Sequence, residues 1–173
     1  MLFRSPIAAW KHTLDVDILG TLYCLQFASQ AMQRRGGGAI VTVGSTSALG
    51  HGGHKASAAP AYDTAKAAVM RMTSNLAGLA TTDGIRVNCI VPDWVATPQV
   101  RAYWDPLTPR ERQAAGAPPM LTPTEEIAGC IVELLTNESL AGRLLVCWTG
   151  KPPALMPYSD PGYASLENVL VGE

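Results

Sequence analysis

Apolar side chains recur every three or four residues over the first part of the chain and predict one long amphipathic helix. These positions run through residues 7 to 32, after Ser5-Pro6, where a capping hydroxyl precedes a proline at the first helical position. Gly36-Gly37-Gly38 ends the run. A second long helix is expected over residues 60 to 82, and it ends at Asp83-Gly84.

Short β-branched runs alternate with these helices and predict buried strands. Residues 39 to 43 and 85 to 91 are apolar runs bounded by glycine or proline, as expected of strands in a parallel sheet. Residues 143 to 148 give a third run of this kind. Helix and strand in alternation form the α/β crossover pattern. The predicted fold is therefore α/β, a Rossmann-like parallel sheet with flanking helices.

The chain between the second and third predicted strands is less regular. Residues 93 to 119 mix proline, arginine and glutamate, and they predict a mobile excursion with a short helix at about residues 109 to 115. Thr122-Pro123-Thr124-Glu125 then has the spacing of a capping box. It predicts the start of a helix that continues through Leu135.

Length and composition describe a single globular unit. A chain of 173 residues can bury a real core, and 47% apolar with 16% charged residues is typical of much buried surface. After Gly150 the sequence becomes rich in proline, which favours extended chain. We therefore expect residues 1 to 150 to form one domain and residues 151 to 173 to form an extended tail.

Charge and cysteine usage exclude several classes of partner. Thirteen basic and 14 acidic residues give a net charge of -1, so nucleic acid and anionic membranes are poor candidate partners. There is no apolar run of membrane-spanning length and no signal-like N-terminus, and we expect a cytoplasmic protein. The four widely spaced cysteines include no CxxC pair and are expected to be reduced core residues.

Two residues that together could move a proton stand in the second predicted helix. Tyr62 and Lys66 are four residues apart, which places the phenol and the ammonium on one helix face. A cation beside a phenol favours the phenolate, so such a pair could exchange a proton at neutral pH. Ser45, at the end of a neighbouring strand, could hold a substrate oxygen beside the phenol.

Four motifs in this order resemble those of the short-chain dehydrogenase/reductase family, over roughly residues 6 to 150. They are Ile40-Val41-Thr42-Val43-Gly44-Ser45, Tyr62-Asp63-Thr64-Ala65-Lys66, Arg86-Val87-Asn88 and Pro92-Asp93-Trp94-Val95-Ala96-Thr97. The resemblance implies a Rossmann-type oxidoreductase that transfers hydride between NAD or NADP and a small carbonyl or alcohol substrate. It makes residues 1 to 150 the catalytic half of such a domain.

The resemblance also implies a role for each motif. Tyr62 would be the general acid/base, Lys66 would favour its ionised form and hold the nicotinamide ribose, and Ser45 would orient the substrate oxygen. Two hydroxyl donors placed in this way stabilise the alkoxide that hydride transfer to a carbonyl produces. The residues implied to line the cofactor, besides Tyr62 and Lys66, are Pro92, Val95 and Thr97.

Each of these residues also has a plainer interpretation. Ser45 could be a strand-end turn residue, Lys66 a solvated helix lysine, and Thr97 the cap of a following helix. Their joint occurrence in the family's order favours the catalytic interpretation.

Two aspartates depart from the family's pattern. Asp17 stands where the family usually has an asparagine that helps a water-mediated proton relay to the active-site lysine. We expect Asp17 to act at the catalytic site by pairing with Lys66 through water, and a buried acid held by backbone groups is the alternative. Asp93 replaces the usual glycine in a turn that tolerates aspartate, so little loss is expected.

Two further segments could bind a metal ion or the substrate. His51-Gly52-Gly53-His54 lacks a third metal ligand and an acid to orient a Ser-His pair, so we expect no metal and a substrate-loop or exposed segment. The aromatic residues of the 93 to 119 excursion resemble the family's variable substrate lid. They suggest a fairly apolar ketone or alcohol, although they could equally pack the lid on the core.

The glycine-rich strand, turn and helix that bind pyrophosphate in Rossmann units are absent from this sequence. Gly36-Gly37-Gly38 follows a helix and precedes a strand, the reverse of the required order. Three explanations stay open: a piece of a dehydrogenase, a non-catalytic oligomerisation or interaction module, or a small enzyme with another cofactor mode. A free strand edge is expected beside residues 39 to 43, and a homo-oligomer is expected through the two long helices.

Overall fold

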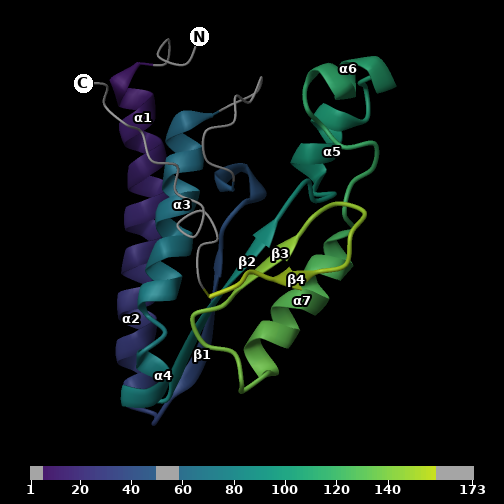
Figure 1. The fold of residues 1–173 in the computed structure, drawn as a ribbon. Helices are drawn as coiled ribbons and strands as arrows, with labels where there is room; N and C mark the ends of the chain where they lie inside the picture. Colours follow the sequence, from purple (N-terminus) through teal and green to yellow (C-terminus); the bar gives the residue numbers. More distant parts are fainter. Residues whose placement is uncertain (1–5, 50–58, 159–173) are drawn as a thin grey trace, which may run out of the picture.

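The computed structural model describes residues 6 to 49 and 59 to 158, which form a four-stranded sheet flanked by helices (Figure 1). The first three strands are parallel and adjacent in chain order, and the fourth adds to β3 in the antiparallel sense. The strands are β1 (Gly38–Val43), β2 (Ile85–Pro92), β3 (Leu144–Cys147) and β4 (Ala154–Leu155). The Rossmann-like parallel sheet with flanking helices is therefore confirmed.

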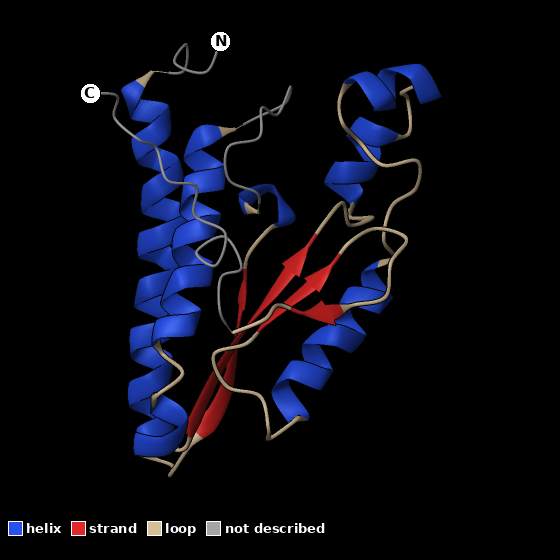
Figure 2. Cartoon of the chain, in the orientation of Figure 1, coloured by secondary structure: helices blue, strands red, loops and turns tan. Residues whose placement is uncertain are grey.

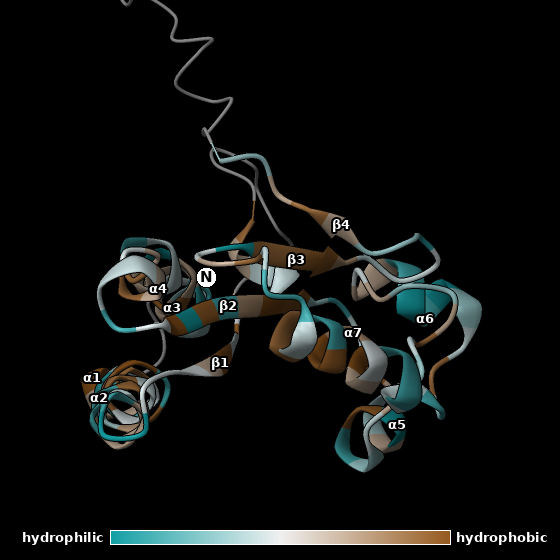
Figure 3. Ribbon diagram, turned by 90° about the horizontal axis from the view of Figure 1, so that it is seen from below, coloured by the Kyte–Doolittle hydropathy of each residue, from teal (hydrophilic) through white to brown (hydrophobic). Residues whose placement is uncertain are grey.

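The long helices cover both faces of this sheet. On one side lie α1 (Ile7–Leu14), α2 (Thr21–Gln33) and α3 (Pro60–Asn75), and on the other lies α7 (Thr124–Thr136) (Figures 1 and 3). This arrangement follows from the helical crossovers that connect parallel strands. Among the helices of residues 6 to 49 and 59 to 158, none has the length and apolar character needed to cross a membrane.

Alternate residues of β2 build the core on the two faces of the sheet. Cys89 and Val91 pack with Met70 of α3, whereas Ile90 packs with Leu134 of α7. All five side chains are buried. Because both faces are covered, residues 85 to 91 are mainly apolar, with Arg86 and Asn88 as the exceptions, and this pattern allowed the strand to be predicted.

The first long helix contains a wider turn that its sequence pattern does not predict. Between α1 and α2, residues Asp15–Gly20 form a π-helical segment, η1. The hydroxyl of Thr21 donates to the carbonyl of Asp17 at 2.7 Å, just after this segment. The apolar spacing continues across η1, so the expectation of one regular helix over residues 7 to 32 was wrong in this detail.

The second long helix is shorter than expected. It is broken after α3, and α4 (Leu79–Thr82) follows as a separate turn of helix. At the break, Ala77 lies against Gly142, where an added Cβ would come within 2.4 Å of the Ala77 side chain. Gly142 has a φ of 69°, a conformation that favours glycine, so this close approach depends on it.

The excursion of residues 93 to 119 contains two short helices rather than one. The expected helix is α6 (Pro109–Ala114), and the unpredicted one is α5 (Pro98–Trp104). The capping box also lies elsewhere than expected. The side chain and backbone of Thr108 form it with Glu111 at the start of α6.

The expected capping box at Thr122 is absent because Thr122 contacts Val95 and Thr149 instead. Its main chain forms an isolated parallel bridge with Val95, and its hydroxyl lies 3.2 Å from the hydroxyl of Thr149. The side chain is therefore buried between strand ends, and α7 begins after Pro123 without a side-chain cap.

The two edges of the sheet differ. Within the described residues β1 pairs only with β2, so its other edge has no strand beside it. The expected extended tail contributes β4, which covers part of the opposite edge. All four cysteines are free, but Cys24 is exposed rather than buried because it lies on the outer face of α2.

Candidate active site

A cavity of about 610 Å³ opens at the carboxyl ends of the parallel strands. In Figure 2 the arrowheads of β1, β2 and β3 point towards the end of the sheet where α5 and α6 lie. Residues that directly follow these strands line the cavity, together with the first turn of α3. Ligand sites of open α/β sheets lie at this position.

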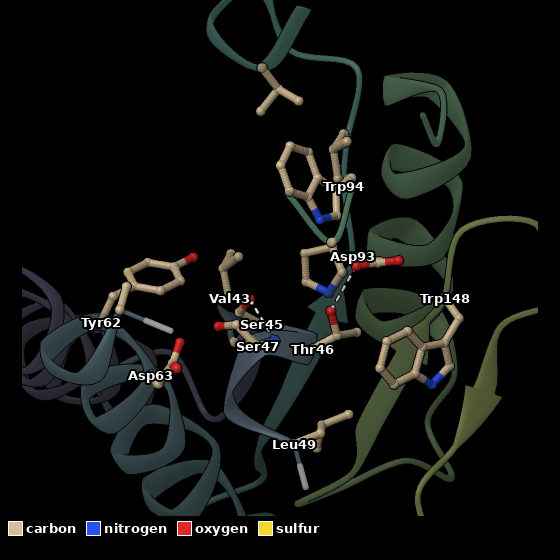
Figure 4. Close-up of a pocket in the computed structure, with 16 residues that line it drawn as sticks. Val43, Ser45, Thr46, Ser47, Leu49, Tyr62, Asp63, Asp93, Trp94 and Trp148 are labelled. Atoms are coloured by element: carbon tan, nitrogen blue, oxygen red, sulfur yellow. Dashed lines mark hydrogen bonds between the residues drawn. The ribbon is translucent and has the colours of Figure 1, made fainter. Parts of the chain in front are cut away.

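Tyr62 and Ser45 both line this cavity, and Figure 4 shows the phenol reaching into the space above Ser45. Tyr62 belongs to the first turn of α3, which Pro60 opens, and it is 38% exposed. The oxygen of Ser45 accepts the backbone N–H of Ser47 at 3.2 Å. Because that bond uses a lone pair, the hydroxyl proton of Ser45 is free to point at a ligand oxygen.

Lys66 lies one helical turn beyond Tyr62, behind the cavity wall. Its ammonium nitrogen is 5.4 Å from the centroid of the Tyr62 ring and donates to the carbonyl of Val43 at 3.4 Å. The same nitrogen lies 2.9 Å from a carboxylate oxygen of Asp17. The sequence predicted a contact between Asp17 and Lys66 through water, but the ion pair in the structure is direct.

The π-helical segment presents Asp17 to this ammonium. Asp17 lies in η1, and η1 contacts α3 along its length. A π turn adds a residue to the helical turn and so rotates the side chains that follow it. Both charged side chains are largely buried, with 13% of Lys66 and 22% of Asp17 exposed, so solvent screens the pair only partly.

The residues expected at the cofactor do not all reach the cavity. Pro92, at the end of β2, and Val95 both line it, as does Tyr62. Thr97 instead caps α5, where its oxygen accepts the N–H of Val100 at 3.3 Å, and it is not part of the cavity wall. The plainer interpretation of Thr97 therefore describes its contact in this structure.

Sequence reasoning missed four polar or aromatic residues of the wall: Thr46, Asp63, Asp93 and Trp148. The hydroxyl of Thr46 donates to one carboxylate oxygen of Asp93 at 3.0 Å, as Figure 4 shows. The backbone N–H of Thr149 donates to the other carboxylate oxygen at 3.4 Å. Asp93 and Trp148 directly follow strands and Thr46 lies three residues after β1, and this position near strand ends is the signal that could have found them.

Cysteine chemistry and metal binding find no support in the described residues. Burial raises the pKa of the Cys89 thiol, and burial together with the nearby Cys130 raises the pKa of Cys147 to about 12. Both thiols therefore stay protonated and are poor nucleophiles. Residues 6 to 49 and 59 to 158 hold no group of three or more metal-ligating side chains, and His51 and His54 lie outside these ranges.

A family model described as enoyl-(acyl carrier protein) reductase matches residues 2 to 142. Cis-4-hydroxycyclohexanecarboxylate dehydrogenase of Sinomonas cyclohexanicum is 35% identical over 137 residues, 79% of this chain and 53% of that protein. A short-chain type dehydrogenase/reductase from Mycobacterium ulcerans superposes with a TM-score of 0.72 at 26% identity, over 85% of this chain and 53% of that one.

One similar structure contains a cofactor. ElxO with NADP bound superposes with a TM-score of 0.74 at 25% identity, over 87% of this chain and 60% of that chain. The fold, the family match and these relatives together define the class: the chain belongs to the short-chain dehydrogenase/reductase family of oxidoreductases. It spans about half the length of the curated relatives that it matches, such as 53% of the Sinomonas protein.

Proposed function

We propose that this chain carries the proton-transfer site of an NAD- or NADP-dependent dehydrogenase or reductase that acts on a small carbonyl or alcohol substrate. The observation that carries the proposal is the arrangement of Ser45 and Tyr62 on one cavity wall with Lys66 directly behind the phenol. Family membership supports the reaction class, because the relatives are named dehydrogenases and reductases.

Each residue has a distinct task in the reduction of a carbonyl. As the carbonyl carbon gains hydride, Tyr62 gives its phenolic proton to the substrate oxygen, and Ser45 donates a hydrogen bond to the same oxygen. In alcohol oxidation the proton moves from the substrate hydroxyl to Tyr62. The nicotinamide supplies or accepts the hydride when it is bound.

Lys66 and Asp17 act behind the phenol. The ammonium lies beside the Tyr62 ring, and the Asp17 carboxylate at 2.9 Å neutralises part of its charge. Lys66 would also hold the nicotinamide ribose, a role that the family resemblance implies. Asp17 is therefore proposed as a modifier of proton transfer rather than as a proton donor.

The cavity fits the nicotinamide end of a dinucleotide. Pro92 and Val95 form an apolar wall near Tyr62, and a volume of about 610 Å³ can hold a nicotinamide together with a small substrate. The glycine-rich pyrophosphate motif is not in this sequence, so residues elsewhere would hold the phosphates. The NADP-bound structural relative agrees with a dinucleotide cofactor but does not decide between NAD and NADP.

The substrate lid supports a partly apolar substrate. Trp94 lines the cavity and stacks on Tyr103, with 6.0 Å between ring centroids. Trp104, in contrast, packs within the lid, because Arg112 lies 3.3 Å over its ring and its N–H donates to the carbonyl of Pro118. Of these aromatics, Trp94 is thus the one proposed to touch substrate.

Oligomerisation is proposed through the first long helix. Leu22, Tyr23 and Phe27 of α2 are exposed apolar residues on its outer face. A homo-oligomer would cover these apolar side chains.

The cavity with the hydroxyls of Ser45 and Tyr62 favours an enzyme over a purely structural module. A cytoplasmic location remains the expectation for such an enzyme.

Cofactor titration combined with one substitution tests the proposed function. The full chain is titrated with NADH and NADPH by fluorescence and calorimetry, and turnover is followed with simple ketones and secondary alcohols. We expect binding of one cofactor in the wild type and in Tyr62→Phe, with turnover strongly reduced in the variant. Turnover that is unchanged in Tyr62→Phe, or no binding of either cofactor, would contradict the proposal for this chain.

A further inference from the structure

The carboxylate of Asp93 connects the ends of the three parallel strands. Asp93 follows β2, and its two oxygens accept from the hydroxyl of Thr46, after β1, and from the backbone N–H of Thr149, after β3. Its own N–H donates to the carbonyl of Cys147, the last residue of β3, at 3.0 Å. One side chain thus links all three segments that form the floor of the cavity.

These contacts use both carboxylate oxygens of Asp93. Both carboxylate oxygens already accept hydrogen bonds from the protein, at 3.0 and 3.4 Å. The Thr46 side chain that donates one of them is buried, with 5% exposed. A buried donor that lost its acceptor would be left unsatisfied, so this bond strongly constrains where Thr46 lies.

Thr46 is joined to Ser45 through the backbone and through a short turn. Ser45 is its direct neighbour and caps a short 3₁₀ turn, η2 (Thr46–Ala48). In this turn the N–H of Ala48 donates to the carbonyl of Ser45 at 3.1 Å, and the N–H of Leu49 donates to the carbonyl of Thr46 at 3.0 Å. The turn is also held by packing, because Ala48 and Leu49 lie against a buried cluster that includes Met70 and Val91. The Thr46 to Asp93 bond is the contact that ties the turn to the ends of β2 and β3.

We propose that Asp93 is a positioning residue that fixes the Ser45 hydroxyl opposite Tyr62 by holding Thr46. The inference rests on the proposed function for the meaning of that position, but the connection between the strand ends stands on the contacts alone. It differs from the sequence expectation that Asp93 merely replaces a turn glycine with little effect. A glycine at this position has no side chain and could not link the strand ends.

Four variants of the full chain separate a positioning role from a turn residue. Asp93→Gly removes both acceptors, and Thr46→Val removes the donor while it keeps the shape of the side chain. Asp93→Asn can still accept from Thr149 with its carbonyl and donate to Thr46 with its amide. Thr149→Val is the matched control, because it keeps the backbone N–H that Asp93 accepts and removes only the hydroxyl near Thr122.

Amide hydrogen exchange at Ala48 and Leu49 is measured for each variant. We expect exchange to become about tenfold faster in Asp93→Gly and in Thr46→Val, as the loss of a hydrogen bond to a charged group predicts. Asp93→Asn and Thr149→Val should stay within about twofold of the wild type, and the amides of β2 should be unchanged in all four. Unchanged exchange in both Asp93→Gly and Thr46→Val would overturn the proposal.

Turnover then tests the link to Ser45 separately. Asp93→Gly and Thr46→Val should each lower kcat about tenfold with little change in KM. Asp93→Asn should keep most of the wild-type kcat. The double variant should be no worse than either single one, because both remove the same bond. Faster amide exchange with an unchanged kcat would overturn the positioning role. If the chain has no turnover, amide exchange alone tests whether Asp93 holds Thr46.

Discussion

The ammonium of Lys66 lies 2.9 Å from the carboxylate of Asp17, although the two residues come from different helices. The cation expected to act on Tyr62 is therefore shared with an acid. An ion pair that is largely buried is strengthened by its surroundings, and the removal of one partner leaves the other uncompensated. In the proposed mechanism, proton transfer by Tyr62 thus involves a residue 45 positions earlier in the sequence.

Replacement of Asp17 with Asn should change the pH profile of turnover. The substitution removes the negative charge that lies 2.9 Å from the Lys66 ammonium, which itself lies beside the Tyr62 ring. The measurement is kcat/KM against pH for the wild type and the variant. Asp15→Asn is the matched control, because Asp15 lies in the same π-helical segment but is exposed. Coincident profiles for Asp17→Asn and the wild type would rule out this role.

Replacement of Tyr62 with Phe should reduce kcat by about 10² to 10⁴, the usual contribution of a positioned acid or base. The ring stays in place, so stacking with a ligand and the contact with Lys66 should persist. Steady-state turnover and thermal unfolding check these two expectations. Tyr103→Phe is the control, since the Tyr103 ring stacks on Trp94 and its loss of a hydroxyl should be neutral.

Arg86 should be important for stability rather than for catalysis. Its guanidinium donates to the carbonyls of Asn137 at 2.9 Å and Leu134 at 3.2 Å, where α7 ends. Replacement with Lys removes the planar fork, and we expect a loss of about 1.5 to 3 kcal/mol in the free energy of unfolding. Urea unfolding measures it, with exposed Arg110→Lys as the control. Equal effects of the two substitutions would contradict the assignment.

Stability should fall as the pH rises above about 9 because of the buried thiols. The folded-state pKa of Cys147 is raised to about 12, so the unfolded chain loses this proton first. Stability from the group is complete below the ordinary pKa near 9.0 and is lost as pH rises towards the folded value. Urea midpoints at about pH 8 and about pH 10.5 test this. Cys147→Ala should show a smaller decrease than the wild type, and the exposed Cys24→Ala should behave like the wild type.

Replacement of Phe27 with Asp should weaken self-association. Phe27 is 65% exposed on α2, and a charge placed in an apolar contact between copies is unfavourable. Sedimentation of the two proteins over a range of concentrations measures the effect. Gln30→Glu, also exposed on α2, provides a control for added negative charge. If Phe27→Asp leaves the oligomeric state unchanged, the contact between copies lies elsewhere.

The strands could be predicted because their sequences are mainly apolar, as expected for a parallel sheet with helices on both faces. Residues 39 to 43 and 85 to 91 form β1 and β2, and β2 is the more deeply buried of the two. Ser45, Tyr62 and Lys66 could be found because a helix fixes the spacing of the last two and a strand end places the first. These are local relationships, which a sequence records directly.

Contacts between distant segments could not be predicted in the same way. Thr122 has the spacing of a helix cap, but its bridge to Val95 and its contact with Thr149 take precedence. The hydrogen bond from Thr46 to Asp93 joins residues 47 positions apart, and the local sequence around either residue does not predict it. Local propensity was overridden at each of these points by a tertiary contact.

The π-helical segment Asp15–Gly20 has a consequence for how this helix can vary. A π turn is equivalent to one residue inserted into an α-helix, and each residue of an α-helix accounts for about 100° of rotation. Deletion of a single residue there would turn α2 about its axis and carry Leu25 away from the core. In this helix, insertions and deletions therefore decide which face meets the sheet, and length is only a secondary effect.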